Sequence, residues 1–448
     1  MELKDKRVLV VGLGKSGVAS ALFLKAHGAR VTVSDTKSGD ELHNEIPALL
    51  DQGITVETGG HGERTFRGQD LIVVSPGVPT DAPPLVQARA LGEQVIGEIE
   101  LAALFLPGPI VAITGSNGKT TTTTLTGEIL TAAGLPTLVG GNIGTPAISL
   151  AEHAKPESIT VLEVSSFQLE TIQSFRPKIA VVLNVTPDHL DRHRTLENYV
   201  DAKARIFENQ GADDFTVLNE DDPTCAALAE RTRAQVFWFS RQKEVKQGAW
   251  VRDGKILFRD RTGQREIMQV AEIPLKGAHN LENVLAAACA ASLMGCAPEK
   301  IGQAVRAFKA VEHRLEFVAT VRGVDYYNDS KATNVDATIK ALESFPAGIH
   351  LILGGKDKGS DYTVLNELLR ERVTRVYTIG AAAGKIESQL RNVEVVHAET
   401  LDNAVRKASV AARPGEVVLL APACASFDQF KSYEHRGKMF KEIVRGLG

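Results

Sequence analysis

The stretch that decides the fold is "VAITGSNGKTTTTTLTGEIL", residues 111–130, which joins a β-branched apolar run to an amphipathic helical pattern. Phosphates are bound by closely approaching backbone N–H groups, a helix N-terminus and a cation, and a nucleotide's magnesium also needs a hydroxyl ligand. The turn supplies all of these, with Lys119 to reach the β- and γ-phosphates and Thr120 to bind the metal. It predicts a nucleoside triphosphate site formed by Gly115, Ser116, Asn117, Gly118, Lys119, Thr120 and Thr121.

The turn departs from the common G-x-x-x-x-G-K-[ST] pattern, because Ile113 stands where the first glycine is expected. The alternative interpretation is a glycine-rich strand-to-helix turn with a solvated lysine. Strand, turn and helix nevertheless follow one another as a phosphate-binding loop requires, and Gly134 ends the helical pattern. This order favours phosphate binding.

Short apolar runs alternate with helical patterns along the chain, which is typical of parallel βαβ units. Between Val236 and Ile273 the pattern changes to hairpins, with Asp253-Gly254 as a turn, and predicts a small antiparallel patch. We predict an α/β protein of three domains: a Rossmann-like N-terminal domain (1–97), a central P-loop ATPase-like domain with a parallel sheet (98–310) and a Rossmann-like C-terminal α/β domain (311–448).

The charge and cysteine content of the chain indicate what kind of molecule it binds. The 448 residues carry 51 Lys+Arg against 55 Asp+Glu, a net charge of −4 that favours small-molecule partners over a nucleic acid or a membrane surface. The four cysteines, Cys225, Cys289, Cys296 and Cys424, form no CxxC pair and indicate neither a disulfide framework nor a zinc site. The start "MELKDKRVLVVGLG" lacks the apolar stretch of a secretory signal. We expect a cytoplasmic protein, and a monomer.

Several motifs follow the phosphate loop along the chain: "LEVSSFQLE" (162–170), "NVTPDHLDRH" (184–193), "GAHNLEN" (277–283), "HRLE" (313–316) and "NDSKATN" (328–334). Together with the loop, these motifs resemble the Mur ligase family, whose members use ATP to add amino acids to a nucleotide-linked peptidoglycan precursor. The resemblance covers essentially the whole chain in order. Two further stretches, "GLGKSG" (12–17) and "APACASFDQF" (421–430), resemble the type of member that joins D-glutamate to UDP-N-acetylmuramoyl-L-alanine.

The resemblance implies two Mg²⁺ sites. Glu163 is a metal ligand beside Thr120 in the family, and His189 is a ligand of the second ion. Taken alone, Glu163 is an ordinary strand-end charge, and Lys203 is a solvated lysine of a helix. A cationic amine repels Mg²⁺, and the matching lysine of the family is carbamylated by CO2 into an anionic oxygen ligand. The implied catalytic residues are Lys119, Glu163, His189 and Lys203, with the metal held by Thr120, Glu163, His189 and Lys203 as its carbamate.

The resemblance also assigns the remaining ATP contacts. Asn280 and Asn283 stand one helical turn apart; N-capping of the helix accounts for Asn280, whereas the family pattern brings Asn283 to the adenine. Arg314 is expected to contact a phosphate when domains close, and Asp329 and Lys331 to face the nucleotide. Closure of this kind excludes water from a reactive phosphate intermediate.

The turn "GLGKSG" has two interpretations. With Asp35 about 20 residues further on, it fits a dinucleotide fingerprint, and a diphosphate of UDP requires the same helix N-terminus. The resemblance favours UDP. It implies that the first domain holds the uridine diphosphate end of the substrate with Lys15, Ser16, Asp35, Thr36, Ser75 and Gly77, and that Asn142 lies nearer the muramoyl part.

The incoming D-glutamate has two carboxylates that need cations and hydroxyl groups. The residues that match the family's amino-acid pocket are Thr333, Lys358, Ser426 and Tyr433. In "GGKDKG" (354–359) both Lys356 and Lys358 are candidates for the side-chain carboxylate.

In the implied reaction, the L-alanyl carboxylate attacks the γ-phosphate of ATP and the resulting acyl phosphate is attacked by the amine of D-glutamate. The sequence assigns no general base for the amine. The alternatives are another amide ligase, a nicotinamide-binding oxidoreductase or sensor built on "GLGKSG", and an ATP-driven switch. The diamino-acid-adding ligases typically carry an Asn-Pro-Arg motif, and this sequence has none.

Overall fold

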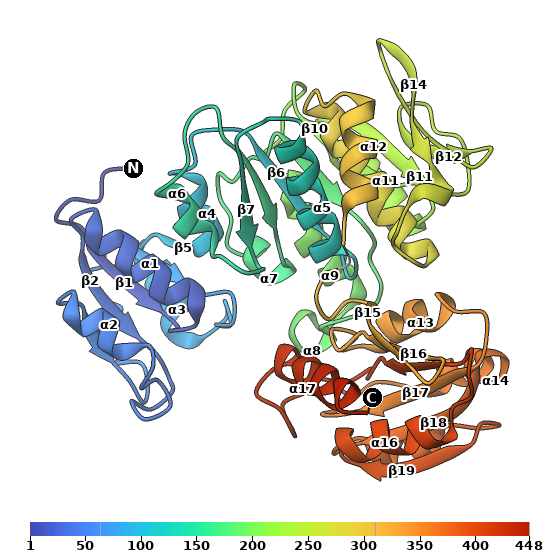
Figure 1. Ribbon diagram of the computed structural model, residues 1–448. Coiled ribbons are helices and arrows are strands. Elements are labelled where there is room, and N and C mark those ends of the chain that lie inside the picture. Colours follow the sequence, from blue (N-terminus) through green and yellow to red (C-terminus); the bar gives the residue numbers. More distant parts are fainter. Residues whose placement is uncertain (63, 310, 448) are drawn as a thin grey trace. The chain divides into compact units, whose positions relative to one another are not determined.

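The computed structural model describes residues 1–62, 64–309 and 311–447 (Figure 1). The chain divides into two compact units, of which the first comprises Met1–Ala271 with Asn283–Val305 and the second Glu272–Glu282 with Arg306–Gly448. The predicted domain boundary at residue 310 and the chain end at residue 448 lie outside the described residues, so the three sets of domain limits stay predictions. No helix of the described chain is long and apolar enough to cross a membrane.

The first sheet belongs to the first unit and consists of five parallel strands in the order β3-β2-β1-β4-β5. Its strands are β1 (Arg7–Val11), β2 (Arg30–Ser34), β3 (Thr55–Glu57), β4 (Leu71–Val74) and β5 (Val95–Gly97). The helices of this region are α1 (Lys15–Ala26), α2 (Ile46–Asp51), α3 (Pro83–Ala90) and α4 (Glu98–Ala103). The strands β1 and β4 are almost wholly buried, as expected for the centre of a parallel sheet.

The second sheet, also in the first unit, has nine strands in the order β14-β13-β12-β11-β10-β9-β6-β8-β7. They are β6 (Ile110–Thr114), β7 (Thr137–Gly141), β8 (Ile159–Glu163), β9 (Ile179–Val182), β10 (Phe215–Asn219), β11 (Gln235–Ser240), β12 (Gly248–Arg252), β13 (Lys255–Asp260) and β14 (Gly263–Gln269). The predicted antiparallel patch is confirmed: β12 pairs antiparallel with β13, and Asp253 (φ 51°) and Gly254 (φ 72°) form the turn between them. Because β12 also pairs with β11, this patch continues the main sheet.

Helices connect the strands of the second sheet and lead on to the second unit. They are α5 (Lys119–Ala132), α6 (Ala147–Ala151), α7 (Ser166–Leu169), α8 (Leu190–His193), α9 (Leu196–Ala204), α10 (Pro223–Ala227), α11 (Ala278–Leu293) and α12 (Pro298–Ala307). Short 3-10 helices are η1 (Arg205–Phe207), η2 (Leu228–Arg231) and η3 (Val270–Glu272). The amphipathic pattern that was predicted to end at Gly134 forms α5, and Gly134 follows it at φ 83°.

The third sheet forms the second unit and has six strands in the order β15-β16-β20-β17-β18-β19. They are β15 (Glu316–Val321), β16 (Val324–Asn328), β17 (Ile349–Gly354), β18 (Val373–Ile379), β19 (Val395–Glu399) and β20 (Val417–Leu420). Its helices are α13 (Val335–Glu343), η4 (Thr363–Leu365), α14 (Asn366–Arg372), α15 (Ala383–Gln389), α16 (Leu401–Ala411) and α17 (Tyr433–Arg445). Only β15 runs antiparallel to its neighbour, so the predicted α/β class with parallel sheets is confirmed.

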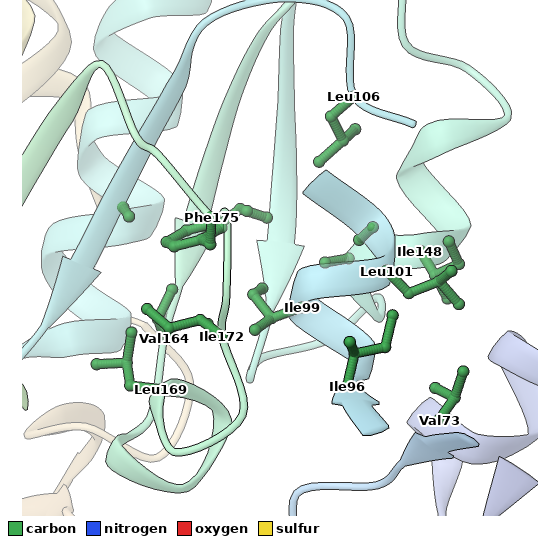
Figure 2. Packing of buried hydrophobic residues seen from close by; sticks show 14 of the residues in the cluster. Val73, Ile96, Ile99, Leu101, Leu106, Ile148, Val164, Leu169, Ile172 and Phe175 are labelled. Carbon is green, nitrogen blue, oxygen red and sulfur yellow. The ribbon is translucent and has the colours of Figure 1, made fainter. Parts of the chain in front are cut away.

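One cluster of buried apolar side chains continues from the first sheet into the second (Figure 2). Val73 of β4 and Ile96 of β5 belong to it, together with Ile99 of α4, Ile148 of α6 and Phe175. Burial of apolar area is the dominant favourable term in folding, and the shared cluster therefore stabilises the packing between the two sheets.

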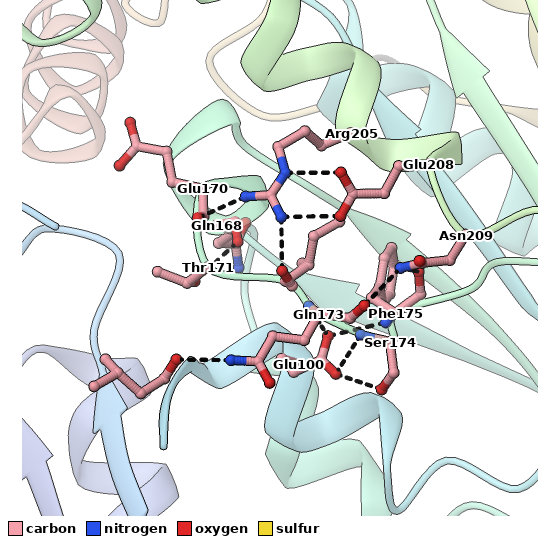
Figure 3. A network of polar contacts seen from close by, with 12 residues as sticks. Glu100, Gln168, Glu170, Thr171, Gln173, Ser174, Phe175, Arg205, Glu208 and Asn209 are labelled. Atoms are coloured by element: carbon pink, nitrogen blue, oxygen red, sulfur yellow. Dashed lines mark hydrogen bonds and ion pairs between the residues drawn. The ribbon is translucent and has the colours of Figure 1, made fainter. Parts of the chain in front are cut away.

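A buried carboxylate of α4 fixes the segment that precedes β9 (Figure 3). Glu100 accepts hydrogen bonds from the backbone N–H groups of Gln173 (2.9 Å), Ser174 (2.8 Å) and Phe175 (2.9 Å). Arg205, directly after α9, donates to the backbone carbonyl groups just before this segment, those of residues 170 (2.6 Å) and 172 (2.7 Å). The two hydrogen bonds of Arg205 hold the carboxyl end of α9, the helix that carries Lys203.

Candidate active site

The phosphate loop lies between β6 and α5, as predicted. Gly118 caps α5 in the left-handed conformation (φ 84°), which L side chains rarely adopt. A Cβ at Gly118 would lie 2.2 Å from Oδ1 of Asn283, so a side chain here would also displace this asparagine. Asn283, in α11, accepts a hydrogen bond from the Thr122 hydroxyl (3.2 Å). The structure therefore brings the predicted adenine contact against the phosphate loop.

Lys119 is folded over the loop. Its ammonium group donates to the carbonyl oxygens of Gly115 (2.8 Å) and Ser116 (2.9 Å). The cation is thereby held over the backbone turn that is predicted to receive the phosphates, which is the position an anion-binding loop requires.

Thr120 and Glu163 meet beside the loop. Glu163 ends β8, whose register places it opposite Ile113 of β6, and its Oε2 accepts the Thr120 hydroxyl at 2.8 Å. The other oxygen, Oε1, accepts from the side-chain amide of Asn142 at 2.9 Å. Both Thr120 and Glu163 are buried. A hydroxyl and a carboxylate are ligands that Mg²⁺ prefers, and this pair fits the predicted metal site.

Lys203 is the clearest departure from its local sequence pattern. The solvated interpretation is wrong, because the side chain is only 1% exposed. Its ammonium group donates to the Gly115 carbonyl (2.8 Å) and lies 4.4 Å from the centre of the Tyr199 ring. Burial, together with the nearby charge of Lys119, lowers the pKa of Lys203 well below its ordinary value. The surroundings of Lys203 therefore favour its neutral amine over the ammonium form, and this is the residue predicted to carry the carbamate.

His189 follows β9 and caps the short helix α8 in a left-handed conformation (φ 53°). Its backbone N–H donates to Oδ1 of Asp188 (2.9 Å), and its ring lies edge-to-face on Phe167 (4.9 Å between centroids). No group of three or more His, Cys, Asp or Glu side chains suited to a metal occurs in the described part of the chain. The role of His189 as a metal ligand stays a prediction.

Sequence reasoning missed Asn184, which follows β9 at the start of the quoted "NVTPDH" motif. Its side-chain oxygen accepts the Asn117 N–H (2.8 Å), and its amide donates to the Asn117 carbonyl (3.1 Å). Ser116 is held in a similar way, since its hydroxyl donates to the Thr186 carbonyl (2.9 Å). Because β9 and β6 are parallel neighbours, their carboxyl ends meet at this edge. That strand order is the signal that would have found Asn184.

The glycine turn after β1 gathers three of the residues expected to bind UDP. Asp35 accepts the backbone N–H groups of Leu13 (2.6 Å) and Lys37 (2.8 Å), and the Ser75 hydroxyl donates to the Gly12 carbonyl (2.7 Å). Lys15 begins α1 and its side chain is exposed. The remaining residues of this set, Ser16, Thr36 and Gly77, are exposed or half-buried.

In the second unit, Asp329 follows β16. Burial raises the pKa of its carboxyl to about 6, against the attraction of Arg314 and Lys331. Arg314 and Lys331 therefore lie near enough to Asp329 to act on its charge, and all three are predicted to face the nucleotide. The ammonium group of Lys331 also lies 5.2 Å from the ring centre of Tyr433.

The residues of the predicted amino-acid pocket come from several elements of the second unit. Lys358 and Ser426 lie on the loops after β17 and β20, whereas Thr333 lies between β16 and α13 and Tyr433 begins α17. Ser426 is buried, whereas Lys356 and Lys358 are exposed, and Thr333 is half-buried. The backbones of Lys356 and Ala425 exchange two hydrogen bonds (2.8 and 3.1 Å), which joins the two loops. Loops at the carboxyl ends of adjacent parallel strands are where α/β proteins usually bind ligands.

One expectation is corrected here. Asn280 does not cap α11, because the helix already begins at Ala278. Its side-chain amide instead donates to the carbonyl of Lys276 (2.7 Å).

A lysine and a threonine in a backbone phosphate cradle, with a buried carboxylate on the hydroxyl, define a nucleotide-dependent phosphoryl-handling protein. Three domain signatures match the chain: "Mur ligase MurD-like, N-terminal domain" at residues 6–97, "Mur ligase middle domain" at 113–291 and "Mur ligase, glutamate ligase domain" at 313–424. The chain belongs to the Mur ligase family and is a ligase. Mur ligases depend on ATP and use Mg²⁺.

Relatives match over their full length. The UDP-N-acetylmuramoylalanine--D-glutamate ligase of Koribacter versatilis is 69% identical over 447 residues, covering 100% of this chain and 99% of that protein. The ligase of the same name from Acidobacterium capsulatum is 61% identical, covering 99% and 97%. The MurF ligase of Thermotoga maritima in complex with ADP superposes with a TM-score of 0.64 at 18% identity, covering 100% of both chains, which shows a shared fold.

Proposed function

We propose that the chain adds D-glutamate to UDP-N-acetylmuramoyl-L-alanine in an ATP-dependent reaction of cytoplasmic peptidoglycan precursor synthesis. The observation that carries this proposal is the phosphate loop with Lys119 folded over it and the Thr120–Glu163 pair beside it. The specificity for D-glutamate is supported by the 69% identical relative that carries this activity in its name.

In the proposed reaction, a carboxylate oxygen of the L-alanyl group attacks the γ-phosphorus of ATP and ADP leaves. Lys119 stabilises the charge that develops on the phosphoryl oxygens. The amine of D-glutamate then attacks the carbonyl carbon of the acyl phosphate, loses a proton, and expels phosphate to leave an amide. The phosphate keeps one oxygen of the original carboxylate.

We infer that two Mg²⁺ ions are held by this chain's own residues, and that they neutralise phosphate charge when bound. Thr120 and Glu163 would hold one ion, and His189 and Lys203 as its carbamate the other. Carbamylation requires a neutral amine, which attacks CO2 and loses a proton. The burial of Lys203 against the Gly115 carbonyl supports this assignment.

The carbamate is tested by two measurements. The variant Lys203→Ala should lose most activity, because an anionic oxygen ligand disappears. A carbamate signal should appear in the carbon-13 spectrum of the wild-type protein in labelled bicarbonate and be absent from Lys203→Ala. Full activity in the variant would contradict the assignment.

The remaining roles follow the family pattern. For UDP we assign Lys15, Ser16, Asp35, Thr36, Ser75 and Gly77, with Asn142 nearer the muramoyl part. For the adenine and phosphates of ATP we assign Asn283, Arg314, Asp329 and Lys331, and for D-glutamate Thr333, Lys358, Ser426 and Tyr433. The domain limits 1–97, 98–310 and 311–448, a monomeric state and a cytoplasmic location remain predictions.

The deciding experiment measures phosphate release from ATP with a panel of amino acids. Release should require both UDP-N-acetylmuramoyl-L-alanine and D-glutamate, and L-alanine or diamino acids should not replace D-glutamate. Release that persists when either substrate is omitted would indicate an ATP-driven switch. Release with another amino acid in place of D-glutamate would indicate a different ligase of the family.

A further inference from the structure

The loop after β17 carries an acid between two lysines. In "GGKDKGSDY" (354–362), Asp357 stands between Lys356 and Lys358, the two candidates for binding a carboxylate of the amino-acid substrate. Both lysines are exposed, and Asp357 is half-buried. A carboxylate at this position competes with an anionic substrate for the lysines unless another cation satisfies it.

The structure supplies that cation from another element. Oδ2 of Asp357 accepts a charge-assisted hydrogen bond from the ammonium group of Lys385 in α15 (2.8 Å). Oδ1 accepts from the Ser360 N–H (3.1 Å) and from the hydroxyl of the fully buried Tyr362 (2.8 Å). No ion pair joins Asp357 to either neighbouring lysine in the part of the chain that the structure describes.

The same contacts fix the loop against the segment that carries Ser426. The Tyr362 hydroxyl lies 3.0 Å from the Cys424 sulfur. The backbone hydrogen bonds between Lys356 and Ala425 lie beside this contact, because Ala425 directly follows Cys424 in the sequence. The position of the two lysines relative to Ser426 therefore depends on how Asp357 is held.

Asp357 is ionised at neutral pH. Burial raises the pKa of this carboxyl, whereas the hydrogen bonds from Lys385 and Tyr362 lower it. The lowering effects outweigh burial, so the pKa lies below the ordinary value. Loss of Lys385 would leave a negative charge in place, and the nearest remaining cations in the sequence are the two lysines beside it.

We propose that Lys385 is a positioning residue for the amino-acid substrate. It orients and neutralises Asp357, and so keeps that carboxylate from competing for whichever of the two candidate lysines, Lys356 or Lys358, binds the side-chain carboxylate of the amino acid. Lys385 acts through Asp357 and does not itself contact the substrate. The inference rests on the proposed function, which supplies D-glutamate as that amino acid.

The test compares the steady-state kinetics of the full-length wild type with three variants, Lys385→Met, Lys385→Arg and the double variant Lys385→Met/Asp357→Asn. Lys385→Met should raise the KM for D-glutamate about tenfold, while kcat and the KM for ATP and for the nucleotide substrate stay within about twofold. Lys385→Arg keeps the cation and should restore the KM. Asp357→Asn removes the charge but keeps an acceptor for Ser360 and Tyr362, so the double variant should recover most of the loss.

A matched control is Lys407→Met, because the ammonium group of Lys407 donates to a backbone carbonyl, that of His397 (3.0 Å). This variant should leave the KM for D-glutamate unchanged. An unchanged KM in Lys385→Met, or a double variant no better than the single one, would overturn the proposal. A parallel rise in the KM of all three substrates would show a structural role only and would also overturn it. Wild-type protein without D-glutamate-dependent phosphate release would contradict the proposed function instead.

Discussion

The first unit contains two glycine-rich turns that each lead from a parallel strand into a helix. One joins β1 to α1 and the other joins β6 to α5. The glycine with positive φ directly follows the strand in the first turn (Gly12, 89°) but caps the helix in the second (Gly118, 84°). Their side chains differ. Lys119 folds back on its own loop, whereas Lys15 is exposed at the start of α1.

The two turns also use their carboxylates differently. Asp35 accepts backbone N–H groups and so shapes the first turn, while Glu163 accepts the Thr120 hydroxyl at the second. A helix N-terminus serves a diphosphate or a triphosphate equally well, but only the second turn adds the oxygen pair that a divalent cation needs. This difference matches the two roles in the proposed function, in which the first turn binds a diphosphate and the second transfers a phosphoryl group.

The largest effect is expected from Lys119→Ala. Removal of a cation that stabilises the developing phosphoryl charge should lower kcat about 10³-fold, measured as phosphate release with both substrates saturating. The fold should remain, because the loop is also held by the hydrogen bonds of Asn117 with Asn184 and of the Ser116 hydroxyl with the Thr186 carbonyl. A decrease in kcat of less than about tenfold would contradict the different roles assigned to Lys119 and Lys15.

The second-largest effect is expected from a change to Glu163, whose carboxylate pairs with the Thr120 hydroxyl. Glu163→Gln keeps a side chain of the same shape but lowers the charge offered to Mg²⁺, so the magnesium concentration needed for half-maximal activity should rise and kcat should fall about 10²-fold. Titration of activity with MgCl2 measures both. If the magnesium dependence matched that of the wild type, Glu163 would not be a metal ligand.

Gly17→Ala tests how closely the first turn packs. A Cβ at Gly17 would lie 1.8 Å from the Gly12 carbonyl oxygen, whereas one at Gly14 would meet nothing within 4 Å. Gly17→Ala should therefore lower the free energy of unfolding by about 3 kcal/mol, and the control Gly14→Ala by less than about 1 kcal/mol. Urea denaturation of both variants gives the comparison. Equal stability of the two would contradict the close approach.

The smallest effect is expected from Lys15→Ala. An exposed ammonium group beside a diphosphate contributes little in water, so the KM for UDP-N-acetylmuramoyl-L-alanine should rise about threefold with kcat unchanged. Initial rates over a range of substrate concentrations measure this. A fall in kcat comparable with that of Lys119→Ala would show that the two turns are equivalent.

Local patterns predicted the parts of the molecule that depend on neighbouring residues. The strand-turn-helix unit around Lys119, the parallel sheets and the Asp253-Gly254 hairpin follow from apolar runs and glycines that lie close together in the chain. These features need no knowledge of which strands become neighbours.

The contacts that sequence reasoning missed depend on strand order. Asn184 reaches Asn117 only because β9 lies beside β6 in the sheet. Lys203 has the local pattern of a solvated lysine. Its burial results from packing of α9 against the phosphate loop at Gly115, which lies 88 residues earlier in the chain. The hydrogen bond between Lys385 and Asp357 likewise joins the loop after β17 to α15, the helix that follows the neighbouring strand β18.

The most direct test of the account follows oxygen from the carboxylate to phosphate. UDP-N-acetylmuramoyl-L-alanine labelled with oxygen-18 in its L-alanyl carboxylate is turned over with ATP and D-glutamate, and the released phosphate is examined by phosphorus-31 NMR. Transfer of the terminal phosphoryl group beside Lys119 to that carboxylate predicts phosphate that carries one labelled oxygen per turnover. Amide formation with wholly unlabelled phosphate would contradict it.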